Sequence, residues 1–202
     1  MNEYRPRQDA ARPLDWVNAV FLTGTPLVAL AGTVWYARNY GVSWLDVANF
    51  VVMFCLTSLC VTAGYHRYFA HRFYKLGRFP QFVMALGGTT AVQKGPLWWA
   101  AHHRHHHRWS DTDRDVHSPI RGFWWSHVGW ILAPQNADTD MSKVKDLARF
   151  PELVWLNTYY YVPAIATAVG LYLAGGWWAL YWGFFVSTTL LWHGTFTINS
   201  LT

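Results

Sequence analysis

Charged side chains are scarce in this 202-residue sequence. Asp, Glu, Lys and Arg make up 13% of it, about half of the roughly 25% that soluble domains carry. The 50 residues that follow Glu152 contain none of these four types. Hydrophobic residues reach 52% and include 14 Trp, and such aromatic rings gather at membrane–water interfaces. This composition excludes a disordered chain and an ordinary cytosolic enzyme, and it predicts an integral membrane protein.

Cysteine is nearly absent as well. Cys55 and Cys60 lie in one apolar stretch, and two thiols support neither a disulfide framework nor a cysteine-based metal site. The sequence also lacks a Cys set for an iron–sulfur cluster and a G-x-G-x-x-G motif after a strand. Any nicotinamide cofactor or electron-transfer cluster is therefore expected in a separate protein.

Four largely apolar stretches are long enough to cross a bilayer, which takes about 20 residues. They cover residues 16–37, 43–65, 153–174 and 177–198, and the chain breaks between the last two at Ala174-Gly175-Gly176. We therefore expect an all-α integral membrane fold with four transmembrane helices in two hairpins. Residues 66–152 are predicted to form one helical cap, so that 1–202 is a single domain.

The Lys and Arg residues predict the orientation of these spans. Three Arg precede the first span, and Arg67, Arg72, Lys75 and Arg78 follow the second, whereas the connection between the two holds only Arg38. Because cationic loops stay in the cytoplasm, we expect the N-terminus and the cap to be cytoplasmic. The same basic residues fit contact with anionic lipid or, equally, docking of an acidic partner.

Histidine is concentrated in the predicted cap, in two boxes. The boxes are His66-x4-His71 and His103-x2-His106-His107. Steps of three and four residues bring the imidazoles of the second box to one face of a helix. The five-residue step of the first box leaves its imidazoles about 140° apart on an ideal α-helix, so it needs a helix end or two metal positions. A shared metal removes the mutual repulsion of so many imidazoles, and neutral imidazole is a common ligand. We therefore predict a metal site larger than one ion.

The other polar residues near the boxes have more ordinary interpretations. His102 and His105 lie off the metal-facing side of their helix and are expected to be neighbours of the ligands. His117, His127 and His193 are interpreted as isolated, hydrogen-bonded polar residues. Three carboxylates after the second box fit either acceptors for the outer imidazole N–H groups or a solvated acidic turn. They are Asp111, Asp113 and Asp115.

Four motifs in this sequence resemble the membrane fatty-acyl desaturases, in particular the bacterial relatives of stearoyl-CoA desaturase. They are TAGYHRYFAHR, WWAAHHRHHHRWSDTDRDVHSP, RGFWWSHVGW and HGTFTINS, and the resemblance covers residues 16–202. It implies two iron ions on the cytoplasmic side of four membrane helices, in a bacterial inner membrane. The implied ligands are His66, His71, His103, His106 and His107, with Asn199 reaching one iron through water.

The resemblance also implies an activity and its partners. The irons use O2 to remove two hydrogens from a long saturated acyl chain, commonly giving a cis double bond at carbons 9–10. The substrate is an acyl-CoA or acyl-lipid, the electron donor a ferredoxin or a cytochrome b5-type protein, and no nucleic acid is expected. Trp98 and Trp99 are candidates for lining the mouth of an acyl tunnel, with anchoring at the membrane interface as the alternative.

The sequence departs from the family pattern at its end. The family has a third box of the His-x-x-His-His type and another His shortly after the Asn-Ser pair, and this sequence reaches neither. We expect the chain to be a C-terminally truncated fragment that is itself inactive. Two other functions stay open, a histidine-box hydroxylase or ketolase and a membrane metal-binding or transport protein. A transporter is expected to place ligands within its spans, and these His lie outside them.

Overall fold

The structure, a computed structural model, describes residues 16–201, and this part of the chain consists of helices and turns without a strand. The elements of the long apolar stretches are α1 (Trp16–Tyr40), α2 (Trp44–Leu59), η1 (Cys60–Ala70), α8 (Tyr161–Leu180), η6 (Tyr181–Val186) and α9 (Ser187–Leu201). Those between η1 and α8 are α3 (Arg78–Thr90), α4 (Pro96–Trp109), η2 (Pro119–Arg121), η3 (Trp125–Gly129), α5 (Trp130–Leu132), η4 (Pro134–Asn136), η5 (Met141–Val144), α6 (Lys145–Ala148) and α7 (Pro151–Thr158). The predicted all-α class is confirmed.

Three helical stretches are long and apolar enough to cross a membrane. They are Asn18–Tyr40, Trp44–Ala70 and Tyr161–Leu201. The third has 41 residues, and its backbone leaves the helical conformation at Gly175 and at Gly176, where φ is +66°. Glycine adopts such a positive φ at no steric cost. The break lies where two spans were predicted to separate, while the predicted start at residue 153 falls in α7, before the turn at residues 159–160.

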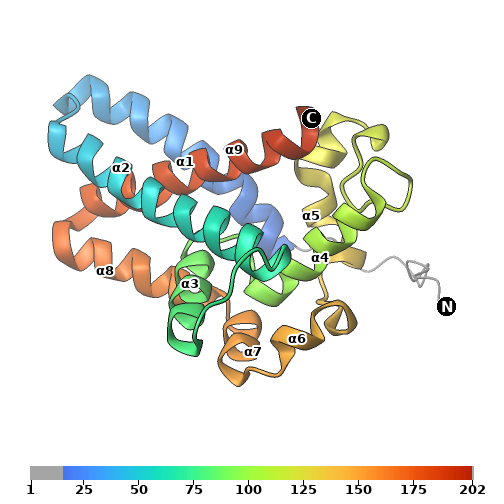
Figure 1. The fold of residues 1–202 in the computed structure, drawn as a ribbon. Coiled ribbons are helices and arrows are strands. Elements are labelled where there is room, and N and C mark those ends of the chain that lie inside the picture. The colour runs from blue at the N-terminus through green and yellow to red at the C-terminus, as the bar shows by residue number, and fades with distance from the viewer. Residues whose placement is uncertain (1–15, 202) are drawn as a thin grey trace.

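The chain reverses direction twice at one end of the molecule. Figure 1 shows α1 turning back into α2, and α8 turning back into α9, both at the end away from α4. At the first reversal Ser43 caps α2, because its hydroxyl accepts from the Asp46 N–H and the Asp46 carboxylate accepts from the Ser43 N–H. Because both reversals lie at one end of these helices, their other end lies next to the cap elements (Figure 1).

The element that carries the first histidine box is a π-helix. η1 continues α2 over Cys60–Ala70, and at its end the His71 N–H donates to the His66 carbonyl over 3.0 Å. This i→i+5 bond defines the π-helix, a form that appears frequently at functional sites. It brings the two imidazoles of the box closer together than an α-helix allows, which resolves the 140° separation expected from the sequence.

A buried apolar cluster holds the cap elements under the two boxes. It joins side chains of η1, α3, α4, η5, α6 and α7, namely Tyr65, Phe69, Ala85, Leu97, Ala100, Ala101, Val144, Leu147, Leu153 and Leu156. Arg104 reinforces this packing, because its guanidinium donates to the carbonyl of Phe69 (2.6 Å) and to both oxygens of Asp146 (2.8 and 3.0 Å). The end of η1 is thereby fixed against α4.

Candidate metal centre

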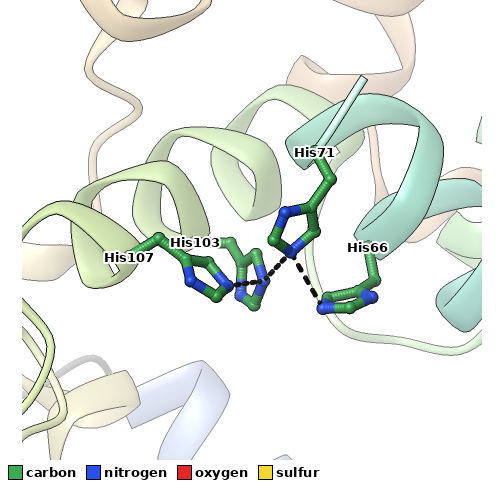
Figure 2. Close-up of side chains that lie close together, drawn as sticks. All are labelled: His66, His71, His103 and His107. Atoms are coloured by element: carbon green, nitrogen blue, oxygen red, sulfur yellow. Dashed lines mark hydrogen bonds between the residues drawn. The ribbon is translucent and has the colours of Figure 1, made fainter. Parts of the chain in front are cut away.

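Four histidine side chains from two elements converge on one point (Figure 2). His66 and His71 lie at the end of η1, and His103 and His107 lie on α4. The Nε2 atom of His71 is 3.1 Å from that of His66 and 3.2 Å from that of His103. The Nε2 atoms of His103 and His107 are 2.9 Å apart. The two predicted boxes therefore meet, and we call these residues the four-histidine group.

Hydrogen bonding alone cannot satisfy the four-histidine group. Each Nε2 carries either one N–H or one lone pair, yet the Nε2 atoms of His71 and His103 each face two others. Burial and the neighbouring imidazoles lower the pKa of His103 to about 2, and the same causes lower the pKa of His107. Both are thus neutral at pH 7, as metal ligands must be. One cation would accept all four lone pairs, so the group fits a metal ion.

His106 belongs to a second group, although the sequence places it beside His107. Its Nδ1 lies 2.8 Å from Oδ2 of Asp115, and its ring centroid lies 4.2 Å from that of His117. Ligand atoms of these three residues lie within 4.8 Å of one another. We call them the His106 group.

Asp115 is the carboxylate that accepts from an imidazole. It is 1% exposed, whereas Asp111 and Asp113 are exposed and form the solvated turn that was the alternative. Burial by itself would raise the pKa of the Asp115 carboxyl, but the hydrogen bond from His106 and the nearby His117 outweigh it, so the pKa is lowered. A charged acceptor of this kind fixes the tautomer of a ligating imidazole.

The interpretation of His117 as a hydrogen-bonded polar residue is wrong. Its side chain is buried, and among the described residues its Nδ1 has no hydrogen-bond partner. That nitrogen lies 3.9 Å from Oδ1 of Asp115, beyond hydrogen-bond distance. The signal in the sequence was the position of His117 two residues after Asp115, in a loop that starts at the end of the second box.

The remaining histidines lie outside both groups, as predicted. Nδ1 of His102 donates to a backbone carbonyl one turn earlier in α4 (2.9 Å), and Nε2 of His105 donates to a carbonyl in the following loop (2.8 Å). His127 and His193 bond to each other over 3.0 Å. These side chains have ordinary partners and no place at either group.

A cavity of about 930 Å³ opens beside the two groups. His66, His103, His117 and Asn199 lie in its polar wall, and apolar side chains of α1, α8, η6 and α9 form most of the rest. The volume is at the upper end of the range for small-molecule sites, about 300–1,000 Å³. The cavity therefore suits a long apolar ligand that passes close to the imidazoles.

The two tryptophans that precede the second box both line this cavity. The Trp99 ring stacks on His103 with 4.6 Å between centroids. Trp98 is buried, and its indole N–H donates to the carbonyl of Asn136 over 2.7 Å. A buried, hydrogen-bonded indole is part of the cavity wall, which disfavours the alternative of an interfacial anchor for Trp98.

Comparison with known proteins identifies the family. The family model for fatty acid desaturases matches residues 41–201. The chain belongs to the fatty acid desaturase family. It is 35% identical over 192 residues to the sn-1 stearoyl-lipid 9-desaturase of Anabaena variabilis, covering 94% of this chain and 69% of that relative. It is also 35% identical over 201 residues to the sn-2 palmitoyl-lipid 9-desaturase of Nostoc sp. (strain 36), covering 96% and 68%.

A eukaryotic relative is named for an acyl-CoA substrate instead of a lipid. The probable acyl-CoA desaturase of Schizosaccharomyces pombe is 32% identical over 200 residues, covering 94% of this chain and 40% of that relative. This membership confirms the family that was inferred from the motifs. The comparisons also support an oxidoreductase that acts on fatty acyl chains. It also disfavours the alternative of a metal transporter.

Two residues that position the desaturase site were not found from the sequence. Arg104, inside the second box, holds the end of η1 to α4 and so sets the distance between the boxes. Its position between two histidines in the sequence suggests a charged residue at the surface. Only the fold shows that its guanidinium donates to a buried backbone carbonyl. His117 was interpreted as isolated because a single histidine outside a box is usually a hydrogen-bonded polar residue.

Proposed function

We propose that this desaturase introduces a cis double bond, at carbons 9–10, into a long saturated acyl chain with O2 and two iron ions. The observation that carries the proposal is the four-histidine group at the wall of an apolar cavity of about 930 Å³. The relatives named as 9-desaturases support the position of the double bond. Their lipid-linked substrates favour an acyl-lipid over an acyl-CoA.

The residues divide between two metal positions. The four-histidine group would hold one ion, and His106 would contribute to the other. Asn199 of α9 lines the same cavity and would reach an iron through water. Bound iron supplies the O2 chemistry that removes hydrogen from an unactivated methylene, a step that no side chain performs. The chain's own residues keep His103 and His107 neutral, fix the tautomer of His106 through Asp115, and exclude water from the acyl chain.

The same proposal includes the membrane arrangement and the electron supply. Four spans form two hairpins in a bacterial inner membrane, with the N-terminus and the boxes on the cytoplasmic side. The two chain reversals at the end away from α4 support this topology (Figure 1). Electrons come from a separate ferredoxin or cytochrome b5-type protein, because the sequence has no motif for a reductant of its own.

The ligand count bears on what the 202 residues do alone. Four of the five box histidines share one group, which leaves His106, beside Asp115 and His117, for the other ion. Asp115 accepts from Nδ1 of His106 and so supports a ligand, which leaves two imidazoles, those of His106 and His117, to bind that ion. An open catalytic zinc site keeps three protein ligands, so we expect incomplete iron binding and no turnover by this chain by itself.

The test measures iron content and lipid products in cells that express the chain and the same gene extended through a third histidine box. New double bonds from the extended chain are expected. New hydroxyl groups would favour the hydroxylase alternative, and bound metal without any product would favour a metal-binding protein. Desaturation with two irons bound by the 202 residues alone would contradict both the ligand assignment and the expected inactivity.

A further inference from the structure

The motif RGFWWSHVGW contains no residue of the four-histidine group or of the His106 group, yet it contacts the helix that carries Asn199. Part of the motif forms η3, a π-helix in which Ser126 and His127 are both buried, and η3 packs against α9. Short π-helical turns appear frequently at functional sites. The motif is therefore a candidate for a role that the two histidine groups do not explain.

The hydroxyl of Ser126 lies between two backbone carbonyls from distant parts of the chain. Its Oγ is 2.6 Å from the carbonyl oxygen of His117 and 2.5 Å from that of Asn199. A serine hydroxyl carries one proton, so a single O–H serves both carbonyls. Ser126 is 0% exposed, which keeps solvent away from this contact. The loop that follows the second box and the end of α9 are thus joined at one oxygen atom.

His127, the next residue of η3, adds two bonds to the same part of α9. Its Nδ1 lies 3.0 Å from Oγ of Ser200, and its Nε2 lies 3.0 Å from Nδ1 of His193. These partners lie before and after Asn199 in the sequence. A rotation of α9 about its axis, which would turn the Asn199 side chain away from its present direction, would break these contacts.

The two residues that Ser126 joins both line the cavity of about 930 Å³, together with His66 and His103 of the four-histidine group. His117 belongs to the His106 group, and its buried Nδ1 has no hydrogen-bond partner among the described residues. The contact between the loop and α9 therefore lies directly behind the polar wall of the cavity.

We propose that Ser126 is a positioning residue of the metal centre, whose hydroxyl sets the distance between His117 and Asn199. This inference rests on the proposed function, in which His117 binds the ion of the His106 group and Asn199 reaches an iron through water. The bonds of Ser126 go to backbone carbonyls, so it acts through these two residues. Without the hydroxyl, two buried carbonyl oxygens would face each other without this donor, which is unfavourable, and the loop would move away from α9.

The test is a Co²⁺ titration of the purified full chain in nanodiscs, followed by absorbance, with circular dichroism to report the fold. Ser126→Ala should weaken Co²⁺ binding about tenfold, because the loss of a residue that supports metal ligands usually costs ten- to a hundredfold, and should change the absorption of the bound Co²⁺. The matched control is Ser187→Ala. Ser187 is 1% exposed, but its hydroxyl donates to the Gly183 carbonyl one turn earlier in the same helical stretch (2.6 Å), so this variant should bind Co²⁺ like the unmodified chain.

Two further variants separate positioning from folding. In an Asn199→Ala background the hydroxyl has one ligand fewer to position, so Ser126→Ala should cost less Co²⁺ affinity there than in the unmodified chain. Equal losses in the two backgrounds would show that Ser126 only stabilises the fold, and would overturn the inference. Ser126→Thr keeps the hydroxyl and should bind Co²⁺ more tightly than Ser126→Ala; the reverse order would contradict the role of the hydroxyl.

Hydrogen exchange of the metal-free chain provides a readout that does not depend on bound metal. Ser126→Ala should speed amide exchange both in residues 111–118 and in residues 195–201, and unchanged exchange in both segments would overturn the inference. If the unmodified chain binds no Co²⁺, the proposed metal centre is wrong and this inference fails with it. If the unmodified chain binds Co²⁺ and Ser126→Ala binds it equally well, only this inference is wrong.

Discussion

Replacing Asp115 by Asn is expected to weaken metal binding at His106 by about ten- to a hundredfold, the usual cost of losing such a hydrogen-bonded neighbour. The buried carboxylate accepts three N–H groups. Its Oδ2 accepts from Nδ1 of His106 (2.8 Å) and the backbone N–H of Asp111 (3.3 Å), and its Oδ1 accepts from the backbone N–H of His117 (3.2 Å). The first bond keeps the proton of His106 on Nδ1, which leaves Nε2 as the ligand atom.

The size of the effect follows from these three bonds. In either orientation, the Asn amide turns an NH2 group toward at least one of the N–H donors, and the remaining oxygen is neutral. A hydrogen bond to a charged group is worth about 1.5–3 kcal/mol, against about 1 kcal/mol for a neutral pair. A loss of about 2 kcal/mol corresponds to roughly thirtyfold in affinity, which lies within the expected range.

The assay is a Co²⁺ titration of the purified chain, with absorbance reporting the ligand field and circular dichroism reporting the fold. Asp113→Asn is the matched control, because Asp113 is exposed in the same loop and should bind Co²⁺ like the unmodified chain. Equal affinities for the two variants would refute the positioning role of Asp115. Loss of helical signal in Asp115→Asn would show instead that the carboxylate mainly stabilises the fold.

Three further outcomes are expected. His103→Ala should remove most of the metal that the chain retains against a chelator, whereas His105→Ala should retain it, since only His103 belongs to the four-histidine group; equal loss in elemental analysis would contradict the division. Gly95→Ala should lower the free energy of unfolding by about 1–3 kcal/mol, because the added Cβ would lie 2.4 Å from a backbone carbon of α7. The control is Gly24→Ala, whose Cβ would have nothing within 4 Å, and it should not lower the melting temperature. The Arg78 guanidinium of α3 forms a bidentate ion pair with Glu152, which lowers the pKa of Glu152 to about 2. The stabilisation from this ion pair is therefore present above pH 4.5 and is lost as the pH falls toward 2. The difference in melting temperature between Glu152→Gln and the unmodified chain should vanish over that window.

The parts of the fold that the sequence predicts depend on local properties, namely the hydropathy of a stretch and the spacing of residues along one helix. The first two spans were predicted at residues 16–37 and 43–65, and the apolar helices run over Asn18–Tyr40 and Trp44–Ala70. Hydropathy suffices for such elements because a span is defined by its own composition. The convergence of His103 and His107 was equally predictable, because a step of four residues leaves two side chains only about 40° apart on a helix.

Contacts between distant elements explain what the sequence does not predict. Successive residues on a helix point about 100° apart, so His106 and His107 face different partners, and only the fold shows that the partner of His106 is Asp115. The π-helical end of η1 has no signature in the hydropathy pattern. Its position against α4 depends on Arg104, whose acceptors in η1 are backbone carbonyls that no residue pattern reveals.

One aromatic ring connects the metal centre to the loop between α3 and α4, in which Val92 and Lys94 have positive φ values. Trp99 stacks on His103 at 4.6 Å and donates its indole N–H to Gln93 over 3.3 Å, so one side chain touches a ligand of the four-histidine group and the strained loop. Protein interiors are densely packed and transmit strain, so a displacement of Gln93 would be passed through Trp99 to His103. In the proposed reaction, Gln93, Trp99 and His103 line the same cavity, so a change in the loop is expected to shift the position of the double bond without altering any metal ligand.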